Sequence, residues 1–263
     1  MGNTLSTTNT QVDGAAALPP GLPPRGESKA VLLIRHGQAQ HNPRENPLWL
    51  FNTLVIRDPD LTPKGIEQAT AASKLLVARS WLPYLEVCLI SPMSRAVHTA
   101  KLLFPTAESD ADAALLPLEL CPLLTEHNKL MCDGGSRKNE LLPRHPFLTS
   151  PPWRALEKLG ADDNQWWPHL GENEAQLEER VEHFKRELAS RPESVICCVG
   201  HGAFFRTLAG IKLPNAEPRW AELTADGAFV LRPEWDTWQP PQEMLARSRA
   251  APAAIDQPSH FDL

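Results

Sequence analysis

Three short apolar runs punctuate the first two hundred residues and predict buried β-strands. They cover residues 30–34, 85–90 and 194–199, and each leads into a polar loop containing Gly or Ser. A continuous apolar run of strand length is typical of a strand that is covered on both faces, as in a parallel sheet. Residues 227–231 form a weaker run, for which we predict an edge strand.

Helical periodicity lies between these runs, over residues 64–79, 94–104 and 173–189. The last segment places Leu177, Val181, Phe184 and Leu188 on one face and opens with Asn173 as a cap. Alternation of buried strands and amphipathic helices predicts an α/β fold: a doubly wound, mostly parallel sheet with helices on both faces, which is a three-layer sandwich.

The same pattern divides the chain into a core domain and less regular segments. Residues 1–28 contain few large apolar groups and end in a Pro-rich stretch, so we expect a disordered leader. The domain then spans residues 29–233. Within it, residues 105–170 are irregular and are interpreted as a lid-like insertion over the carboxyl edge of the sheet, whereas residues 234–263 are expected to be a flexible tail.

Charge and composition indicate which kinds of partner the protein can bind and in which cellular compartment it lies. The chain has 26 Lys and Arg against 32 Asp and Glu, a net charge of −6, and no basic block, which argues against a nucleic-acid partner. No apolar stretch reaches the roughly 18 to 20 residues of a membrane span. The five cysteines show neither CxxC nor His/Cys metal spacing, so we expect a reducing, cytoplasmic location.

The first six residues fit the pattern for N-myristoylation of Gly2. One acyl chain binds membranes weakly, and no neighbouring cysteine or basic cluster supplies a second signal. We therefore expect weak membrane association only if Gly2 is acylated. A chance match in a Thr- and Asn-rich leader is an equal alternative.

Basic side chains follow the three predicted buried strands. Arg35 and His36 end the first, Arg95 lies just after the second, and His201 follows the third. The carboxyl ends of strands form the ligand site of open α/β sheets, so these groups are expected to converge. Such a cluster of positive and imidazole groups in an acidic protein predicts a phosphate site.

Five motifs, in order, resemble the histidine phosphatase superfamily, also called the phosphoglycerate-mutase-like family, and especially its phosphatase-like branch. They are Arg35-His36-Gly37 with Asn42, Leu61-Thr62-Pro63-Lys64-Gly65 with Gln68-Ala69, Ser91 with Ser94-Arg95-Ala96 and Thr99-Ala100, Leu124 with Glu126, and Gly200-His201-Gly202. A lone Arg-His-Gly would be weak support, whereas the ordered set is specific.

The resemblance implies a role for each matching residue. His36 would be the nucleophile, with Arg35, Arg95 and His201 around the phosphoryl oxygens and with Asn42 and Gly202 as further substrate-binding residues. Glu126 would donate the proton to the leaving group. A backbone carbonyl near Gly200 would fix the tautomer of His36. No metal or other cofactor is implied.

Some residues near the motifs leave alternatives open. Glu119 is a rival acid seven residues before Glu126. His41, His98 and His127 adjoin motif residues, and we interpret them as packing or surface groups.

The resemblance favours a histidine acid phosphatase-type enzyme, a phosphomonoesterase acting on a small or medium phosphorylated molecule through phosphohistidine. A phosphoglycerate mutase is the alternative, and a non-catalytic module that binds a phosphorylated ligand is a more distant one. Substrate identity and oligomeric state stay open.

Overall fold

Strand β1 (Lys29–Arg35) lies inside a seven-stranded sheet in the order β4-β3-β2-β5-β1-β6-β7. The computed structural model describes residues 28–42, 46–104 and 115–238. Strands β2 (Val87–Ile90), β3 (Leu118–Leu120), β4 (Trp153–Arg154) and β5 (Val195–Gly200) run parallel to β1, while β6 (Pro218–Leu223) and β7 (Phe229–Leu231) form an antiparallel edge. The mostly parallel sheet is confirmed.

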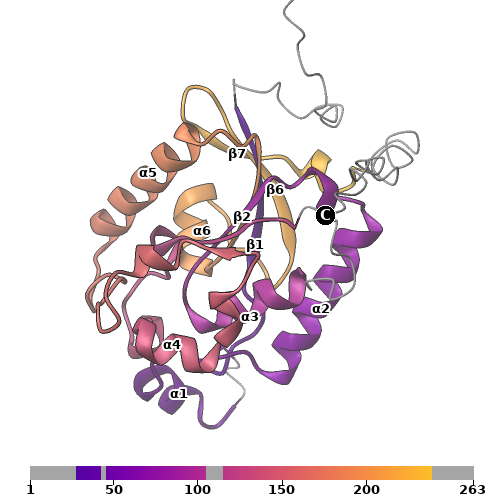
Figure 1. The fold of residues 1–263 in the computed structure, drawn as a ribbon. Helices are drawn as coiled ribbons and strands as arrows, with labels where there is room; N and C mark the ends of the chain where they lie inside the picture. Colours follow the sequence, from indigo (N-terminus) through magenta and orange to yellow (C-terminus); the bar gives the residue numbers. More distant parts are fainter. Residues whose placement is uncertain (1–27, 43–45, 105–114, 239–263) are drawn as a thin grey trace, which may run out of the picture.

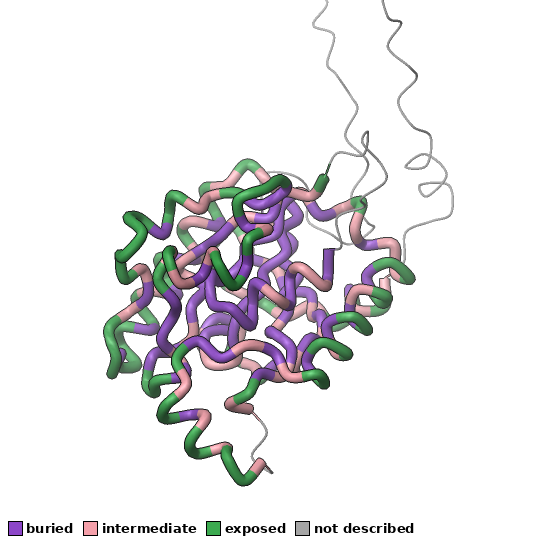
Figure 2. The backbone as a smooth tube through the Cα atoms, turned by 60° about the horizontal axis from the view of Figure 1, so that its bottom comes forward, coloured by how far each residue is buried: buried purple, intermediate pink, exposed green. Residues whose placement is uncertain are grey.

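Helices cover both faces of this sheet (Figure 1). Alternate residues of β1 separate the two cores: Leu32 packs with the apolar faces of α2 (Pro63–Ala78) and α3 (Ser94–Leu103), and Leu33 packs with those of α5 (Glu174–Ser190) and α6 (Gly202–Ala209). Figure 2 shows the resulting buried interior beneath helices whose outer faces are exposed. The three-layer arrangement follows from a central strand that is apolar on both sides.

The smaller elements lie mainly between β2 and α5. Helices α1 (Trp49–Val55) and α4 (Lys138–Arg144) have seven residues each. Short 3-10 helices are η1 (Leu82–Tyr84), η2 (Pro122–Leu124), η3 (Met131–Asp133), η4 (Pro146–Thr149), η5 (Leu156–Leu159) and η6 (Pro233–Trp235).

The expected insertion over residues 105–170 needs correction, because β3 and β4 fall inside it and extend the sheet. These strands have three and two residues, which is too short to show an alternation of apolar and polar positions in the sequence. Residues between them form 3-10 turns and α4 rather than one separate lid.

The boundary of the expected tail also differs. The Trp235 side chain, in η6, is buried, and the Trp81 indole N–H donates to the carbonyl of Trp238 at 3.0 Å. Residues 234–238 are therefore part of the domain. At the other end, Ser28 donates to Glu222 at 2.8 Å, whereas Gly2 and the rest of the leader lie outside the described residues. No described helix has the length and apolarity needed to cross a bilayer.

Candidate active site

The register of three neighbouring strands brings the predicted basic residues together. Arg35 pairs with Gly200 across β1 and β5, and the His36 amide donates to the carbonyl of Gly200 at 2.9 Å. On the other side of β5, the Ser91 amide donates to Val199 at 3.0 Å. The three strands therefore end at the same level, and their last side chains share one space.

His36 is buried, and one of its ring nitrogens is committed to the protein. Nδ1 lies 2.7 Å from the carbonyl oxygen of Gly37. A carbonyl only accepts, so Nδ1 carries the proton and Nε2 holds a lone pair. The acceptor expected near Gly200 is thus Gly37 itself. Burial, then Arg95 and Arg35, hold the pKa of His36 well below its usual range, which keeps Nε2 unprotonated.

The loop after His36 is fixed by the starts of two helices. The Gly37 amide donates to Thr99 Oγ1 at 3.0 Å, and the Gln38 amide donates to Gln68 Oε1 at 2.8 Å. Thr62, which caps α2, donates to the Gln38 carbonyl at 3.2 Å. Thr62, Gln68 and Thr99, three motif residues of these helices, thus hold the loop that follows His36.

Two glycines permit this close approach. A Cβ atom on Gly65 would lie 2.1 Å from the Gln38 carbonyl oxygen, and one on Gly37 would lie 2.4 Å from the Gly65 carbonyl oxygen. Both contacts are to backbone, which cannot move aside as a side chain would.

In both arginines of the site, one guanidinium nitrogen donates to a backbone carbonyl. Arg35 Nη1 donates to the Leu213 carbonyl at 3.1 Å, and Arg95 Nη1 donates to the Cys132 carbonyl at 2.9 Å. A Cβ on Gly202 would lie 3.1 Å from Arg35 Nε, so this glycine makes room for the guanidinium. Burial lowers the pKa of Arg35, Glu126 acts to raise it, and Arg95 lowers it further.

His201 lies beside His36, with ring centroids 5.1 Å apart. Its Nε2 is 2.7 Å from Ser91 Oγ at the end of β2. Burial first, then Arg95, His36, His41 and Arg35, lower the pKa of His201 well below its usual range. The ring is therefore neutral in the free protein.

Several nitrogen atoms at this place are buried without a hydrogen-bond partner among the described residues. Nine buried side-chain nitrogen and oxygen atoms of the described residues lack a hydrogen-bond partner, and five of them belong to this cluster: Arg35 Nε, His41 Nδ1, Arg95 Nε, Arg95 Nη2 and His201 Nδ1. An unsatisfied buried polar group costs about 1–3 kcal/mol. Five of them at one place form a site suited to a ligand rich in acceptor oxygens, such as a phosphoryl group.

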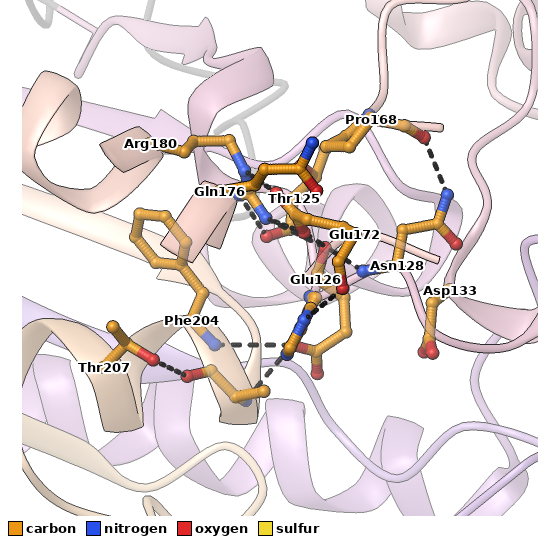
Figure 3. Close-up of polar contacts among 12 residues, drawn as sticks. Thr125, Glu126, Asn128, Asp133, Pro168, Glu172, Gln176, Arg180, Phe204 and Thr207 are labelled. Carbon is orange, nitrogen blue, oxygen red and sulfur yellow. Dashed lines mark hydrogen bonds and ion pairs between the residues drawn. The ribbon is translucent and has the colours of Figure 1, made fainter. Parts of the chain in front are cut away.

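Glu126 faces the start of α6. Its Oε1 accepts from the amides of His127, Ala203 and Phe204 at 2.9, 3.1 and 3.3 Å (Figure 3). Because these amides occupy Oε1, Oε2 is the oxygen available to carry a proton. The rival Glu119 lies on β3 and pairs with Arg191; burial acts to raise its pKa, but hydrogen bonds from Arg191 and Lys158 outweigh burial and lower it.

An ion pair between Arg180 and Glu172 supports the loop that carries Glu126. Arg180 on α5 pairs with Glu172 at 2.7 Å and also donates to the carbonyls of Leu123, Thr125 and Glu126 (Figure 3). The Glu172 carboxylate accepts from the Asn128 amide at 3.2 Å. The sequence does not point to Arg180, because the three carbonyls that it binds lie 54 to 57 residues earlier in the chain.

The neighbouring histidines have distinct partners. His98 pairs with Asp60 at 2.9 Å, and the buried His127 lies 2.7 Å from the Glu172 carbonyl. His41, expected as a packing or surface group, lies 6.2 Å from His36 between ring centroids. Asn42, expected to face a substrate, has its amide nitrogen 3.0 Å from His41 Nε2.

Asp133, at the end of η3, is a further acid that the sequence did not single out. Its Oδ1 lies 4.0 Å from Arg95 Nη2. Burial raises the pKa of Asp133, Arg95 lowers it, and Glu126 raises it, with a net upward shift. A signal existed in the Cys132-Asp133 pair of the sequence, but no feature there connected it to Arg95.

Comparison with known proteins assigns this sequence to a family. A model of the histidine phosphatase superfamily (branch 1) matches residues 31–240. A probable phosphatase of Schizosaccharomyces pombe is 28% identical over 197 residues, which are 73% of this chain and 82% of that protein. A probable phosphoglycerate mutase of Arthroderma benhamiae is 25% identical over 69% of this chain, and the match spans 58% of that protein, less than two thirds.

A solved structure shares the fold. The alpha-ribazole phosphatase of Shigella flexneri superimposes with a TM-score of 0.50 and 21% identity, over 77% of this chain and 94% of that one. At this identity the likeness concerns the fold alone.

Proposed function

The chain belongs to the histidine phosphatase superfamily (branch 1), and from this premise we propose that it is a phosphomonoesterase. It hydrolyses a small or medium phosphorylated molecule in two steps, through phosphohistidine on His36. The observation that carries the proposal is the set of five buried nitrogens without a hydrogen-bond partner around a histidine whose Nε2 is free of a proton.

In the first step, the lone pair of His36 Nε2 attacks phosphorus as the bond to the leaving oxygen breaks. Arg35, Arg95 and His201 donate to the equatorial oxygens, where the charge is concentrated. The departing oxygen takes a proton from Oε2 of Glu126. The imidazole becomes more positive as the P–N bond forms, and the Gly37 carbonyl that fixes Nδ1–H stabilises this charge.

In the second step, the Glu126 carboxylate removes a proton from water, and the water oxygen attacks phosphorus. The P–N bond breaks, inorganic phosphate leaves, and both His36 and Glu126 return to their starting protonation states. The amides on Oε1 stay in place throughout, so the same oxygen, Oε2, gives and receives the proton.

The test is phosphate release from an aryl phosphate by the full chain, with radiolabel trapping of an acid-labile phosphoenzyme. We expect turnover by the wild type and loss of both turnover and label in His36→Ala. His183→Ala, an exposed histidine on α5, is the matched control. An active His36→Ala, or an inactive wild type, contradicts the proposal; the inactive wild type would favour the non-catalytic binding module.

A phosphoglycerate mutase is the second candidate, favoured by the similarity to the Arthroderma benhamiae protein. A mutase returns the phosphoryl group to the product instead of to water. Comparing phosphoglycerate isomerisation with phosphate release in one assay separates the two activities, and faster isomerisation would replace our proposal.

We further propose a cytoplasmic location, supported by five free cysteines that are all buried. Gly2 acylation is a separate prediction: the intact mass after co-expression with an N-myristoyltransferase would rise by one myristoyl group.

A further inference from the structure

We propose that His41 donates a hydrogen bond from Nδ1 to an oxygen of the transferred phosphoryl group, and that Asn42 acts by orienting this ring rather than by touching the substrate. The inference rests on the proposed function and assigns a further substrate-binding residue to the same site. Four observations lead to it.

The first observation is the orientation of Asn42. Its Oδ1 accepts from the Ala39 amide at 2.8 Å, which directs the amide nitrogen Nδ2 toward His41 Nε2 at 3.0 Å. An amide nitrogen only donates, so Nε2 of His41 must accept. The hydrogen-bond network therefore assigns the proton of a neutral His41 to Nδ1.

The second observation is that His41 stays neutral. Burial, followed by Arg95 and Arg35, lowers the pKa of His41 to about 2. Its Nδ1 is thus an uncharged donor at any physiological pH. A third full positive charge beside two arginines would be costly, whereas a neutral N–H adds a hydrogen bond without adding repulsion.

The third observation is the position of this donor. His41 Nδ1 is buried and has no partner among the described residues, like the free nitrogens of Arg35 and Arg95. The His41 ring lies beside the nucleophile, at 6.2 Å between the ring centroids of His41 and His36. A phosphoryl group on His36 Nε2 would bring acceptor oxygens to this unsatisfied nitrogen.

The fourth observation is a parallel with His201. Each of these two rings has one nitrogen held by a neutral polar side chain, Asn42 for His41 and Ser91 for His201, and a second nitrogen that is buried and free. The nucleophile thus lies near two histidines with the same arrangement. The role that the family resemblance implies for His201 therefore extends, on geometry, to His41.

The test uses size-matched substitutions that differ in where they place a donor. The amide nitrogen of Asn lies as many bonds from the backbone as Nδ1 of His, and that of Gln as many as Nε2. We expect His41→Ala and His41→Gln to lower kcat/KM on an aryl phosphate about 10- to 100-fold, the range for a hydrogen bond to a charged group. His41→Asn should recover part of this loss, and His183→Ala should show none.

A double-mutant cycle tests the role of Asn42. Asn42→Ala should lower kcat/KM in the wild type but cause no further loss in His41→Ala. An equal loss in both backgrounds would show that Asn42 contacts the substrate directly and would overturn its assignment. Thermal melts by circular dichroism verify that each variant is folded, and the contrast between His41→Asn and His41→Gln is unaffected by a general loss of packing.

Orthovanadate binding by calorimetry supplies a readout that does not depend on turnover. We expect His41→Ala to weaken vanadate binding by the same factor as kcat/KM. Unchanged vanadate affinity and unchanged kcat/KM in His41→Ala would overturn the inference. If the wild type is active and loses activity in His36→Ala but not in His41→Ala, this inference alone is refuted. If the wild type is inactive, the proposed function is refuted, and vanadate binding still decides the role of His41.

Discussion

Individual side chains at the site divide their polar atoms between the protein and a ligand. His36 Nδ1 donates to the Gly37 carbonyl, and Arg95 Nη1 donates to the Cys132 carbonyl. Glu126 Oε1 accepts from an amide at the start of α6. These bonds to the protein orient each side chain and leave its other polar atoms available for a ligand. Such preorganisation is what electrostatic stabilisation of a transition state requires, because little reorientation is left for the reaction itself.

The assignment of Glu126 as proton donor gives a prediction at this scale. Glu126→Gln keeps an acceptor for the three amides but has no acidic proton. We expect kcat to fall about 10²- to 10⁴-fold on an alkyl phosphate and far less on nitrophenyl phosphate, whose leaving group needs no protonation. Steady-state kinetics on both substrates measure the difference.

Two controls accompany that experiment. Glu119→Gln, in the rival acid on β3, should leave both substrates unaffected. Asp133→Asn tests the other buried acid near Arg95. If Asp133→Asn rather than Glu126→Gln shows the leaving-group dependence, Asp133 is the proton donor.

Residue identities were predictable from the sequence where one motif places a side chain at the end of a buried strand. Arg35, His36 and His201 are of this kind. The partners were not predictable in the same way. Which carbonyl accepts from His36, and that Asn42 faces His41, depend on loop geometry that adjoining residues in the sequence do not encode.

Secondary-structure elements act here as supports for loops. Helix α5 supports the Glu126 loop through Arg180, whose guanidinium bridges Glu172 and three carbonyls. Gln68 of α2 and Thr99 of α3 support the loop that follows His36. The loops that carry His36 and Glu126 therefore depend on residues of the helices behind them.

Removing the Arg180 support should reduce turnover and stability together. Arg180→Ala leaves Glu172 as an unpaired buried charge, so we expect a loss of about 3–5 kcal/mol in the free energy of unfolding and a lower kcat. In Glu172→Gln/Arg180→Met much of the stability should return while kcat stays low. Urea unfolding and steady-state kinetics measure both. Arg186→Ala, exposed on the same helix, is the control, and full activity in the double variant would contradict a positioning role.

A second prediction concerns the contact between α2 and the nucleophile's loop. Gly65→Ala places a Cβ 2.1 Å from the Gln38 carbonyl oxygen, so the helix and the loop must separate. We expect a loss of about 1–3 kcal/mol in stability, the range for overpacking, and a fall in kcat/KM. Lys64→Ala, exposed on the same turn, should change neither, and a Gly65→Ala enzyme with wild-type kinetics would show that the contact is dispensable.

Elements with a strong period or an apolar run were predictable: β1, β2 and β5 as buried strands, and α2, α3 and α5 to within a residue or so at each end. The missed elements are short or depend on a neighbour. β3 and β4 are too brief to show a pattern, and β6 begins at Pro218, a residue that argues against a strand unless it lies at a strand start. Residues 218–223 form strand β6 because they pair with β1, and the sequence alone does not show that pairing.

The protein as a whole should be sensitive to mild acid because it buries neutral histidines. Burial lowers the pKa of His36, His41 and His201. Below pH 6.5 the unfolded chain therefore binds protons that the folded chain does not, so stability falls as pH falls. Each such histidine contributes a slope of about 1.4 kcal/mol per pH unit, and three contribute about 4.

Urea unfolding at pH 7.5, 6.5 and 5.5 measures this slope above the range where carboxylates titrate. Because burial also lowers the pKa of His145, His201→Asn should reduce the slope between pH 6.5 and 5.5 by about a quarter to a third, and His183→Asn should leave it unchanged. A slope that is the same in His201→Asn as in the wild type would show that His201 is protonated in the folded state.

The place of β1 in the sheet has a consequence for biosynthesis. This strand is made early, yet its two neighbours, β5 and β6, begin at residues 195 and 218. Its apolar run therefore leaves the ribosome long before either edge can be paired, and it resembles an aggregation-prone segment during that interval. The nascent chain should need a chaperone until residues 195–223 have emerged, and any truncation before residue 195 leaves both edges of β1 unpaired.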